Sequence, residues 1–261
     1  MKDTAQKGDS TVSWLTDLVK GSLVKVVKDA DDVVKVVVDT IGQRVKETTQ
    51  VALELAGQMS QATAQGTRSA IRAADESGAD ALKVGVNLLT GVLSSASETT
   101  VGAIQAAGSV VSGVIQGLSD VGSDVEKAIA RLVGEAVQAS AEVGGSVGKV
   151  TQGTVIGVVS GVSKTATELT GAVRSAVTSA VEAASASGQD VGQVAVAAVN
   201  GVLEGAKKVG VNASDVLQTS LTAAMEAGTA ISADAAQKVK KALSSSVAGA
   251  SEILSHNKAN S

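Results

Sequence analysis

An eleven-residue repeat is the feature of this 261-residue chain that most constrains its fold. Residues 144–161 match residues 188–205 at eight of eighteen positions, which is a step of four elevens along the chain. Residues 78–95 match 188–205 at seven positions, which is a step of ten elevens. Internal repeats at a fixed period are typical of arrays and solenoids.

Written in rows of eleven, with one row starting at Gly91, the chain keeps its second column apolar through seventeen consecutive rows, from Met59 to Ala235. Eleven residues in three turns is about 3.67 residues per turn, so the apolar columns cover about half of one helix surface. Strand alternation would place the same columns on both faces of a sheet. The pattern predicts an all-α fold of long amphipathic helices, with a β-solenoid of 22-residue coils as the alternative. The predicted helix-facing or lipid-facing column consists of Val92, Ala103, Val114, Val125, Ala136, Val147, Val158, Leu169, Ala180, Val191 and Val202.

The eleven-residue repeat continues without insertions or deletions, which favours a continuous coiled-coil rod or bundle, straight to slightly right-handed. The alternative is a set of helical hairpins with joints at 22- or 44-residue steps. A glycine followed by Asp or Ser is typical of a helix end and a new N-cap. Such joints are predicted at 77–80, 121–124, 143–146 and 187–190, and similar joints at 209–215 and 231–234.

Composition divides the chain into four segments. Residues 1–12 are a polar tail, 13–56 a charged helical segment, 57–255 a repeat region rich in Gly, Ala, Val and Ser, and 256–261 a C-terminal tail. Trp14 is the single tryptophan, and it is a candidate anchor at a membrane interface or for a partner.

Helix-breaking glycine is abundant, with 28 residues in the chain. Each interior glycine costs about 1 kcal/mol relative to alanine, so an isolated helix of this sequence is not stable in water. Another helix, another copy of the chain or lipid must therefore cover the apolar half. Glycines that recur in the repeat are predicted to allow close helix packing: Gly91, Gly113, Gly117, Gly157, Gly161, Gly201 and Gly205.

Catalytic and ligand-binding chemistry has little support in the sequence. There is no cysteine, and the only histidine, His256, lies in the C-terminal tail. The stretch GGSVGKV at 144–150 lacks the flanking Gly and Ser/Thr of a phosphate-binding loop, because Val143 and Val150 stand there. A net charge of −4 and the lack of Phe and Tyr for base stacking argue against nucleic-acid binding. We expect no enzyme activity, no cofactor and no metal site.

The start of the chain has no apolar segment of a signal peptide, which predicts a cytoplasmic protein, with a place at the periphery of a membrane or granule as the alternative. Residues 99–119 carry no charge and are long enough to span a membrane. Their Ser, Thr and Gln residues keep to the positions of the eleven-residue repeat that are polar in the other rows, which favours amphipathic packing.

With these repeats the sequence resembles hendecad coiled-coil proteins over residues 14–255. That resemblance implies nearly straight or slightly right-handed helical bundles. The row TVIGVVSGVSKTATELTGAV is also similar to the lipid-binding repeats of synucleins and exchangeable apolipoproteins, although this chain lacks their basic rim and their prolines.

Three functional hypotheses follow. The first is a structural protein that self-associates through small-residue apolar faces into an oligomeric bundle, rod or filament. The second is an amphipathic coat on a membrane, lipid droplet or storage granule. The third is a membrane-spanning pore built on 99–119.

Overall fold

The computed structural model describes residues 53–95 and 100–256, and these residues are helical with short turns and no strand. The predicted all-α class is therefore confirmed for the described residues, and the β-solenoid alternative does not apply to them. The helices are α3 (Leu53–Glu76), α4 (Ala81–Ser95), α5 (Thr100–Asp120), α6 (Val125–Glu142), α7 (Val147–Val162), α8 (Leu169–Ala186), α9 (Val191–Val209), α10 (Ala213–Ile231), α11 (Ala233–Ser246) and α12 (Ala250–His256).

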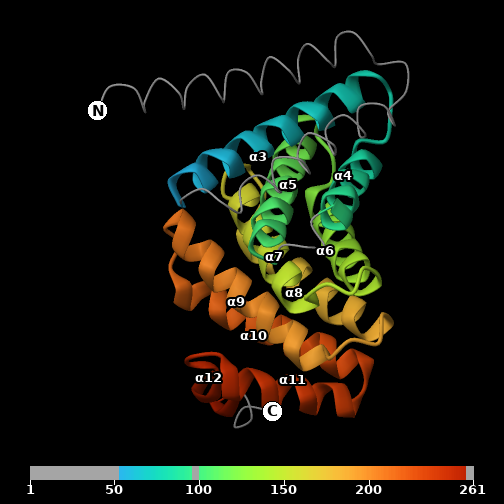
Figure 1. Cartoon of the computed structure of the whole chain (residues 1–261). Helices are drawn as coiled ribbons and strands as arrows, with labels where there is room; N and C mark the ends of the chain where they lie inside the picture. The colour runs from blue at the N-terminus through green and yellow to red at the C-terminus, as the bar shows by residue number, and fades with distance from the viewer. Residues whose placement is uncertain (1–52, 96–99, 257–261) are drawn as a thin grey trace.

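These helices form two rows. Each helix contacts only those one or two places away in chain order. The odd-numbered helices α3, α5, α7, α9 and α11 lie side by side in one row, and the even-numbered helices form the other (Figure 1). Short turns between packed neighbours make consecutive helices antiparallel, so helices within one row run parallel. The arrangement is that of a helical-repeat array.

A helix and its turn together occupy two elevens of sequence through the middle of the chain. Helices α6, α7, α8, α9 and α10 begin at this constant step, at Val125, Val147, Leu169, Val191 and Ala213. Because the step is twice eleven, a turn interrupts the helix without shifting the apolar columns. The uninterrupted eleven-residue repeat is therefore compatible with short helices. The favoured expectation of a continuous rod is wrong for the described residues.

Glycines end several of these helices in the left-handed conformation that disfavours other residues. Gly122, Gly144, Gly188 and Gly210 all have φ between 66° and 75°. After Gly122, the Ser123 amide donates back to the Leu118 carbonyl at 2.9 Å, which completes the C-terminal cap. All six predicted joints coincide with helix ends.

Aspartates cap the start of two of the helices that follow, α6 and α9. The Asp124 carboxylate accepts a hydrogen bond from the Lys127 amide, and Asp190 accepts from the amides of Gly192 and Gln193. These bonds satisfy amides that have no partner in the first helical turn. Left-handed glycine followed by an N-cap is the physical reason that the chain turns back at these joints.

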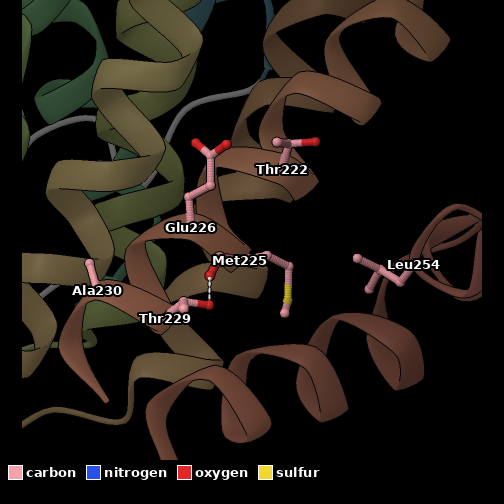
Figure 2. Close-up of a pocket in the computed structure, with 6 residues that line it drawn as sticks. All are labelled: Thr222, Met225, Glu226, Thr229, Ala230 and Leu254. Carbon is pink, nitrogen blue, oxygen red and sulfur yellow. Dashed lines mark hydrogen bonds between the residues drawn. The ribbon is translucent and has the colours of Figure 1, made fainter. Parts of the chain in front are cut away.

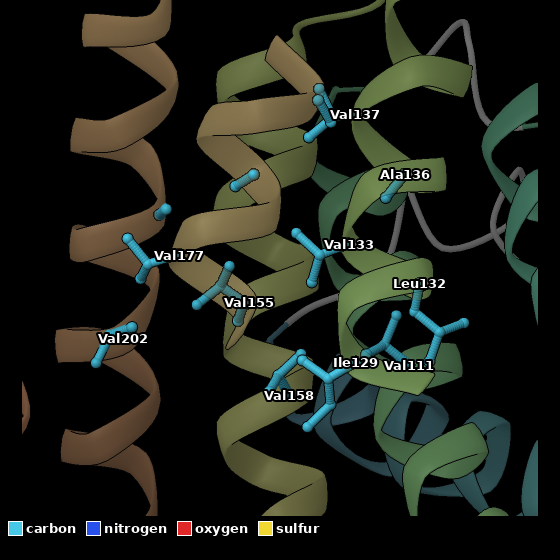
Figure 3. Close-up of a cluster of buried hydrophobic side chains, with 14 of the residues drawn as sticks. Val111, Ile129, Leu132, Val133, Ala136, Val137, Val155, Val158, Val177 and Val202 are labelled. Atoms are coloured by element: carbon cyan, nitrogen blue, oxygen red, sulfur yellow. The ribbon is translucent and has the colours of Figure 1, made fainter. Parts of the chain in front are cut away.

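The core lies between the two rows. Val111 of α5, Val133 of α6 and Val158 of α7 are fully buried there. Figure 3 shows these side chains meeting between the helix ribbons, with Val177 of α8 and Val202 of α9 nearby. The buried hydrophobic side chains are all Ala, Val, Leu or Ile, and filling a core with such small side chains requires the helices to approach closely.

Helix α5 is enclosed by α3, α4, α6 and α7, all of which contact it. Every residue from 109 to 118 is buried. The absence of charge in this part of the segment 99–119 therefore matches a helix that is covered by protein over residues 109–118. A membrane crossing requires a long, strongly apolar helix, and no helix within 53–95 or 100–256 meets that requirement.

Two predicted segment boundaries can be compared with helix positions. The boundary between 56 and 57 falls inside α3, and the boundary between 255 and 256 falls at the last residue of α12. The predicted tail 1–12, Trp14 and most of the charged segment 13–56 lie outside the described residues.

Candidate helix-packing interface

The odd row is held together by glycines that face the backbone of the preceding helix. On α5, a Cβ added at Gly117 would lie 2.6 Å from the Cβ of Ile71 on α3 and 3.1 Å from the carbonyl oxygen of Arg68. A Cβ added at Gly113 would collide with the carbonyl oxygen of Ala64. Only glycine therefore fits at these two positions without a shift of the helix.

The same step recurs one repeat later, where α7 meets α5. A Cβ at Gly157 would collide with the backbone of Gly108, and a Cβ at Gly161 would lie 3.0 Å from the Cβ of Ile115. This pair of close approaches places the backbones of α5 and α7 against each other.

A third instance joins α9 to α7. A Cβ at Gly201 would lie 2.8 Å from the Gln152 carbonyl oxygen, and one at Gly205 would lie 2.8 Å from the Cβ of Val159. Three successive helices of the odd row therefore use two glycines, four positions apart, to approach the helix before them.

These contacts have a constant register along the chain. Gly113, Gly157 and Gly201 each face the carbonyl oxygen of the residue 49 positions earlier. Gly117, Gly161 and Gly205 each face the side chain 46 positions earlier. The odd row is thus one helix-on-helix contact repeated three times, and six of the seven glycines singled out in the sequence form it.

The seventh glycine, Gly91, lies in α4 of the even row and is half-buried. Sequence reasoning missed other close glycines. Gly108 supplies the backbone against Gly157, and a Cβ at Gly85 would lie 2.6 Å from Val114. Gly171 of α8 faces the Glu126 carboxylate of α6. No glycine pattern at an eleven-residue spacing marks these three positions in the sequence.

The predicted apolar column separates into two sets. Six members lie in the middle of successive helices, at every second row of eleven, and have no exposed surface: Val92, Val114, Ala136, Val158, Ala180 and Val202. Others stand at the first residue of a helix, where Val125 and Val191 are buried and Val147 and Leu169 are half-buried. Ala103 lies in α5, and its side chain is outside the described part. The six fully buried members therefore face other helices of the same chain.

Polar contacts also join helices within each row at a constant spacing of 52 positions. Arg68 of α3 donates from Nε and Nη2 to Asp120 of α5 at 2.5 and 2.7 Å. Gln152 of α7 donates to Glu204 of α9 at 3.0 Å, and Arg174 of α8 pairs with Glu226 of α10. The Arg68 guanidinium holds the pKa of the Asp120 carboxyl below its usual range.

Two further features of the described residues bear on metal and ligand binding. Within 53–95 and 100–256, no group of three or more His, Cys, Asp or Glu residues is placed to hold a metal ion. An open depression of about 490 Å³ lies between α10 and α12 (Figure 2). Its Thr229 hydroxyl donates to the Met225 carbonyl of its own helix, and its Glu226 pairs with Arg174. These polar groups are already engaged, so the depression is chiefly an apolar gap between Met225 and Leu254.

Comparisons with known proteins identify no family. No protein-family model matches the chain, and no curated protein matches it. Among solved structures, the chain is similar to a circular tandem repeat protein described as having novel repeat topology and enhanced subunit contact surfaces. The two share 13% sequence identity over 97% of this chain and 66% of that protein, with a TM-score of 0.33. At that score, the similarity is too low to transfer fold or function.

Proposed function

We propose that this protein is a non-enzymatic structural protein, a helical-repeat array whose copies associate through the ends of the array. The repeated glycine contact of the odd row supports this proposal. Helices α5 and α7 present glycines to the helix before them and backbone or side chains to the glycines of the helix after them. The last helices of such a row have only one of these two contacts, which leaves surface for another copy.

At the C-terminal end of the even row, helix α10 is only partly covered by the helix that packs on it. Helix α12 is a seven-residue helix, whereas α10, on which it packs, is far longer. Met225 of α10 is half-buried and points toward the open space beside Leu254 (Figure 2). A helix from a second copy that lay along α10 would fill this gap, and we propose self-association there.

A lipid-coat function is the alternative, and burial of the apolar column weighs against it. Val114, Val158 and Val202 have no exposed surface, so lipid reaches them only if the rows separate. Among the described residues, Val143 at 39% exposure is the one exposed large hydrophobic residue. Interfacial helices usually present a continuous apolar face.

The test is the molar mass and the helix content of the full chain at several micromolar concentrations, by light scattering and circular dichroism. We expect a mass that grows with concentration at constant helix content. Met225→Glu should lower the mass, because it places a charge in the gap, whereas Gln193→Glu at an exposed position of α9 should not. A monomer at all concentrations would contradict the self-association, and a gain of helix that requires anionic vesicles would favour the lipid coat.

A further inference from the structure

The contacts between successive odd helices have a constant spacing in sequence, and this spacing predicts which residues of α3 would contact a helix before it. Each of α5, α7 and α9 contacts the preceding odd helix through two positions four residues apart. One 44-residue period before Gly113 and Gly117 stand Ser69 and Ala73 of α3. These are the positions through which α3 would contact a preceding helix of the same row.

Ser69 and Ala73 lie on the side of α3 that faces away from α5. Thr67 and Ile71 contact α5 and are fully buried. Ser69 and Ala73 follow them by two positions, which is about 200° around the helix, and both are half-buried. The side of α3 opposite its α5 contact therefore carries small uncharged side chains of the type that allows close helix approach.

The opposite end of the odd row has a different surface. Helix α11 buries only Ala235, Val239 and Leu243, whereas its exposed side carries Lys238 and Lys241. A charged outer face is what a terminal repeat needs to stop an array. The α11 end of the odd row is closed in this way, so the C-terminal association proposed above involves only the gap beside Met225 in the even row. The Ser69 and Ala73 side of α3 has no such charged cover.

The chain has the right length and pattern to cover that side of α3. Residues 13–52 lead directly into α3, and this span is close to one 44-residue pair of helices. The 46-position register assigns Leu23 to Ser69 and Val27 to Ala73. In the described repeats, fully buried residues hold the two positions that correspond to Leu23 and Val27. They are Thr67, Val111 and Val155 at the first position, and Ile71, Ile115 and Val159 at the second.

We propose that residues 13–52 form a further repeat that docks in the same chain on α3, with Leu23 and Val27 against Ser69 and Ala73. The docking extends the odd row by one helix. This inference rests on the repeat array of the proposed function and does not require self-association. It makes the segment that carries Trp14, rather than α3, the N-terminal surface offered to other copies.

Disulfide crosslinking tests the register directly, because the chain has no cysteine of its own. Leu23→Cys combined with Ser69→Cys should oxidise rapidly to a crosslink within one chain, seen as a faster band on a non-reducing gel. Lys25→Cys with Ser69→Cys is the matched control, since the proposed helix would turn position 25 about 200° away from position 23. We expect at least a tenfold faster reaction for the first pair than for the control.

The second contact of the register has its own pair of variants. Val27→Cys with Ala73→Cys should crosslink at least tenfold faster than Asp29→Cys with Ala73→Cys, because positions 27 and 29 would lie about 200° apart on the same helix. Agreement between the two contacts would fix both the position and the direction of the docked helix on α3.

Each other result overturns the proposal. Equal rates for the Leu23 and Lys25 pairs would show that the segment does not dock in this register. A crosslinked dimer in place of the monomeric product would show that a second copy supplies the segment. No crosslink in any pair, under conditions that fully oxidise a Cys-containing reference peptide, would show that α3 is not covered. Light scattering on the same samples reports self-association separately. A protein that crosslinks within one chain but stays monomeric would support the docking of residues 13–52 and contradict only the proposed self-association.

Discussion

Gly157 of α7 lies directly against Gly108 of α5, so that the backbones of two helices meet without an intervening side chain. A Cβ at Gly157 would lie 2.8 Å from the Gly108 Cα and closer still to its carbonyl oxygen. Each glycine carries an entropic cost in a helix. Close contact between α5 and α7, with the valines of both helices buried beside it, is what offsets that cost in the folded chain.

Gly157→Ala should therefore destabilise the fold although alanine is the better helix former. We expect a loss of about 1–3 kcal/mol in the free energy of unfolding, because the methyl group must push α7 away from α5. Gly134→Ala is the control, since a Cβ there meets nothing within 4 Å. That change should stabilise the protein by about 0.5–1 kcal/mol. Urea unfolding followed by circular dichroism measures both, and a stabilising Gly157→Ala would show that the helices are not in contact at this point.

Most of the secondary structure could be predicted from the sequence, since the turns at Gly122, Gly144 and Gly188 have both a left-handed glycine and a following N-cap or polar residue. The joint between α7 and α8 could not. There, residues 163–168 hold no glycine, and the turn is closed by bonds such as Thr165 amide to Val162 carbonyl at 2.9 Å. The eleven-residue phase also could not separate a rod from hairpins, because a 22-residue helix and turn preserve that phase.

The interface was only partly visible in the sequence. The glycine pairs at 157 and 161 and at 201 and 205 recur one 44-residue period apart and could be singled out. Their partners could not be predicted. The 49-position register to Gly108 or Gln152 depends on the axial position of α7 and α9 relative to the helices on which they pack. The expectation that the Gln residues of 99–119 lie on the polar side of their helix is wrong for Gln116, which is buried in α5 and donates to the Ser112 carbonyl and hydroxyl.

A charge in the apolar column should disrupt the fold. Val158 is fully buried, so we expect Val158→Asp to cost about 3–5 kcal/mol, because it buries a carboxylate without a partner. Gln116→Asp should also be costly, since it removes the bonds to Ser112 within a buried helix. Gln193→Asp, at an exposed position of α9, should change stability by less than about 0.5 kcal/mol. Thermal unfolding of the three variants checks the order, and a mild Val158→Asp would contradict the packing between the two rows.

Thr154 carries a buried hydroxyl that has no hydrogen-bond partner. Thr154→Val keeps the shape and removes that polar group, so it should stabilise the fold by about 1 kcal/mol. Thr151 is the matched control on the same helix, because its hydroxyl is engaged with the Val147 carbonyl at 2.8 Å. Thr151→Val should cost about 0.5–1.5 kcal/mol. Chemical denaturation compares the two, and equal effects of both changes would show that the Thr154 hydroxyl has found a partner.

The Arg68–Asp120 pair should make stability depend on pH in the acid range. Arg68 favours the ionised Asp120 carboxyl in the folded chain and lowers its pKa, whereas the unfolded chain has no such pair. The unfolded state therefore binds the proton more readily, and the contribution of the pair is present above the ordinary carboxyl pKa of about 4. It is lost as the pH falls through the lower pKa of the folded state. Asp120→Asn should reduce the slope of stability against pH below about pH 4, by a modest amount because the pair is partly exposed.

Urea midpoints measured from about pH 7 down to about pH 2 give this slope for the wild type and for Asp120→Asn. Gln65→Asn, at an exposed position on the same helix as Arg68, is the control and should leave the slope as it is in the wild type, because it changes no titratable group. Raising the salt concentration should reduce the difference between Asp120→Asn and the wild type, because ions screen a partly exposed pair. An unchanged slope in Asp120→Asn would show that α3 and α5 are not joined by this pair.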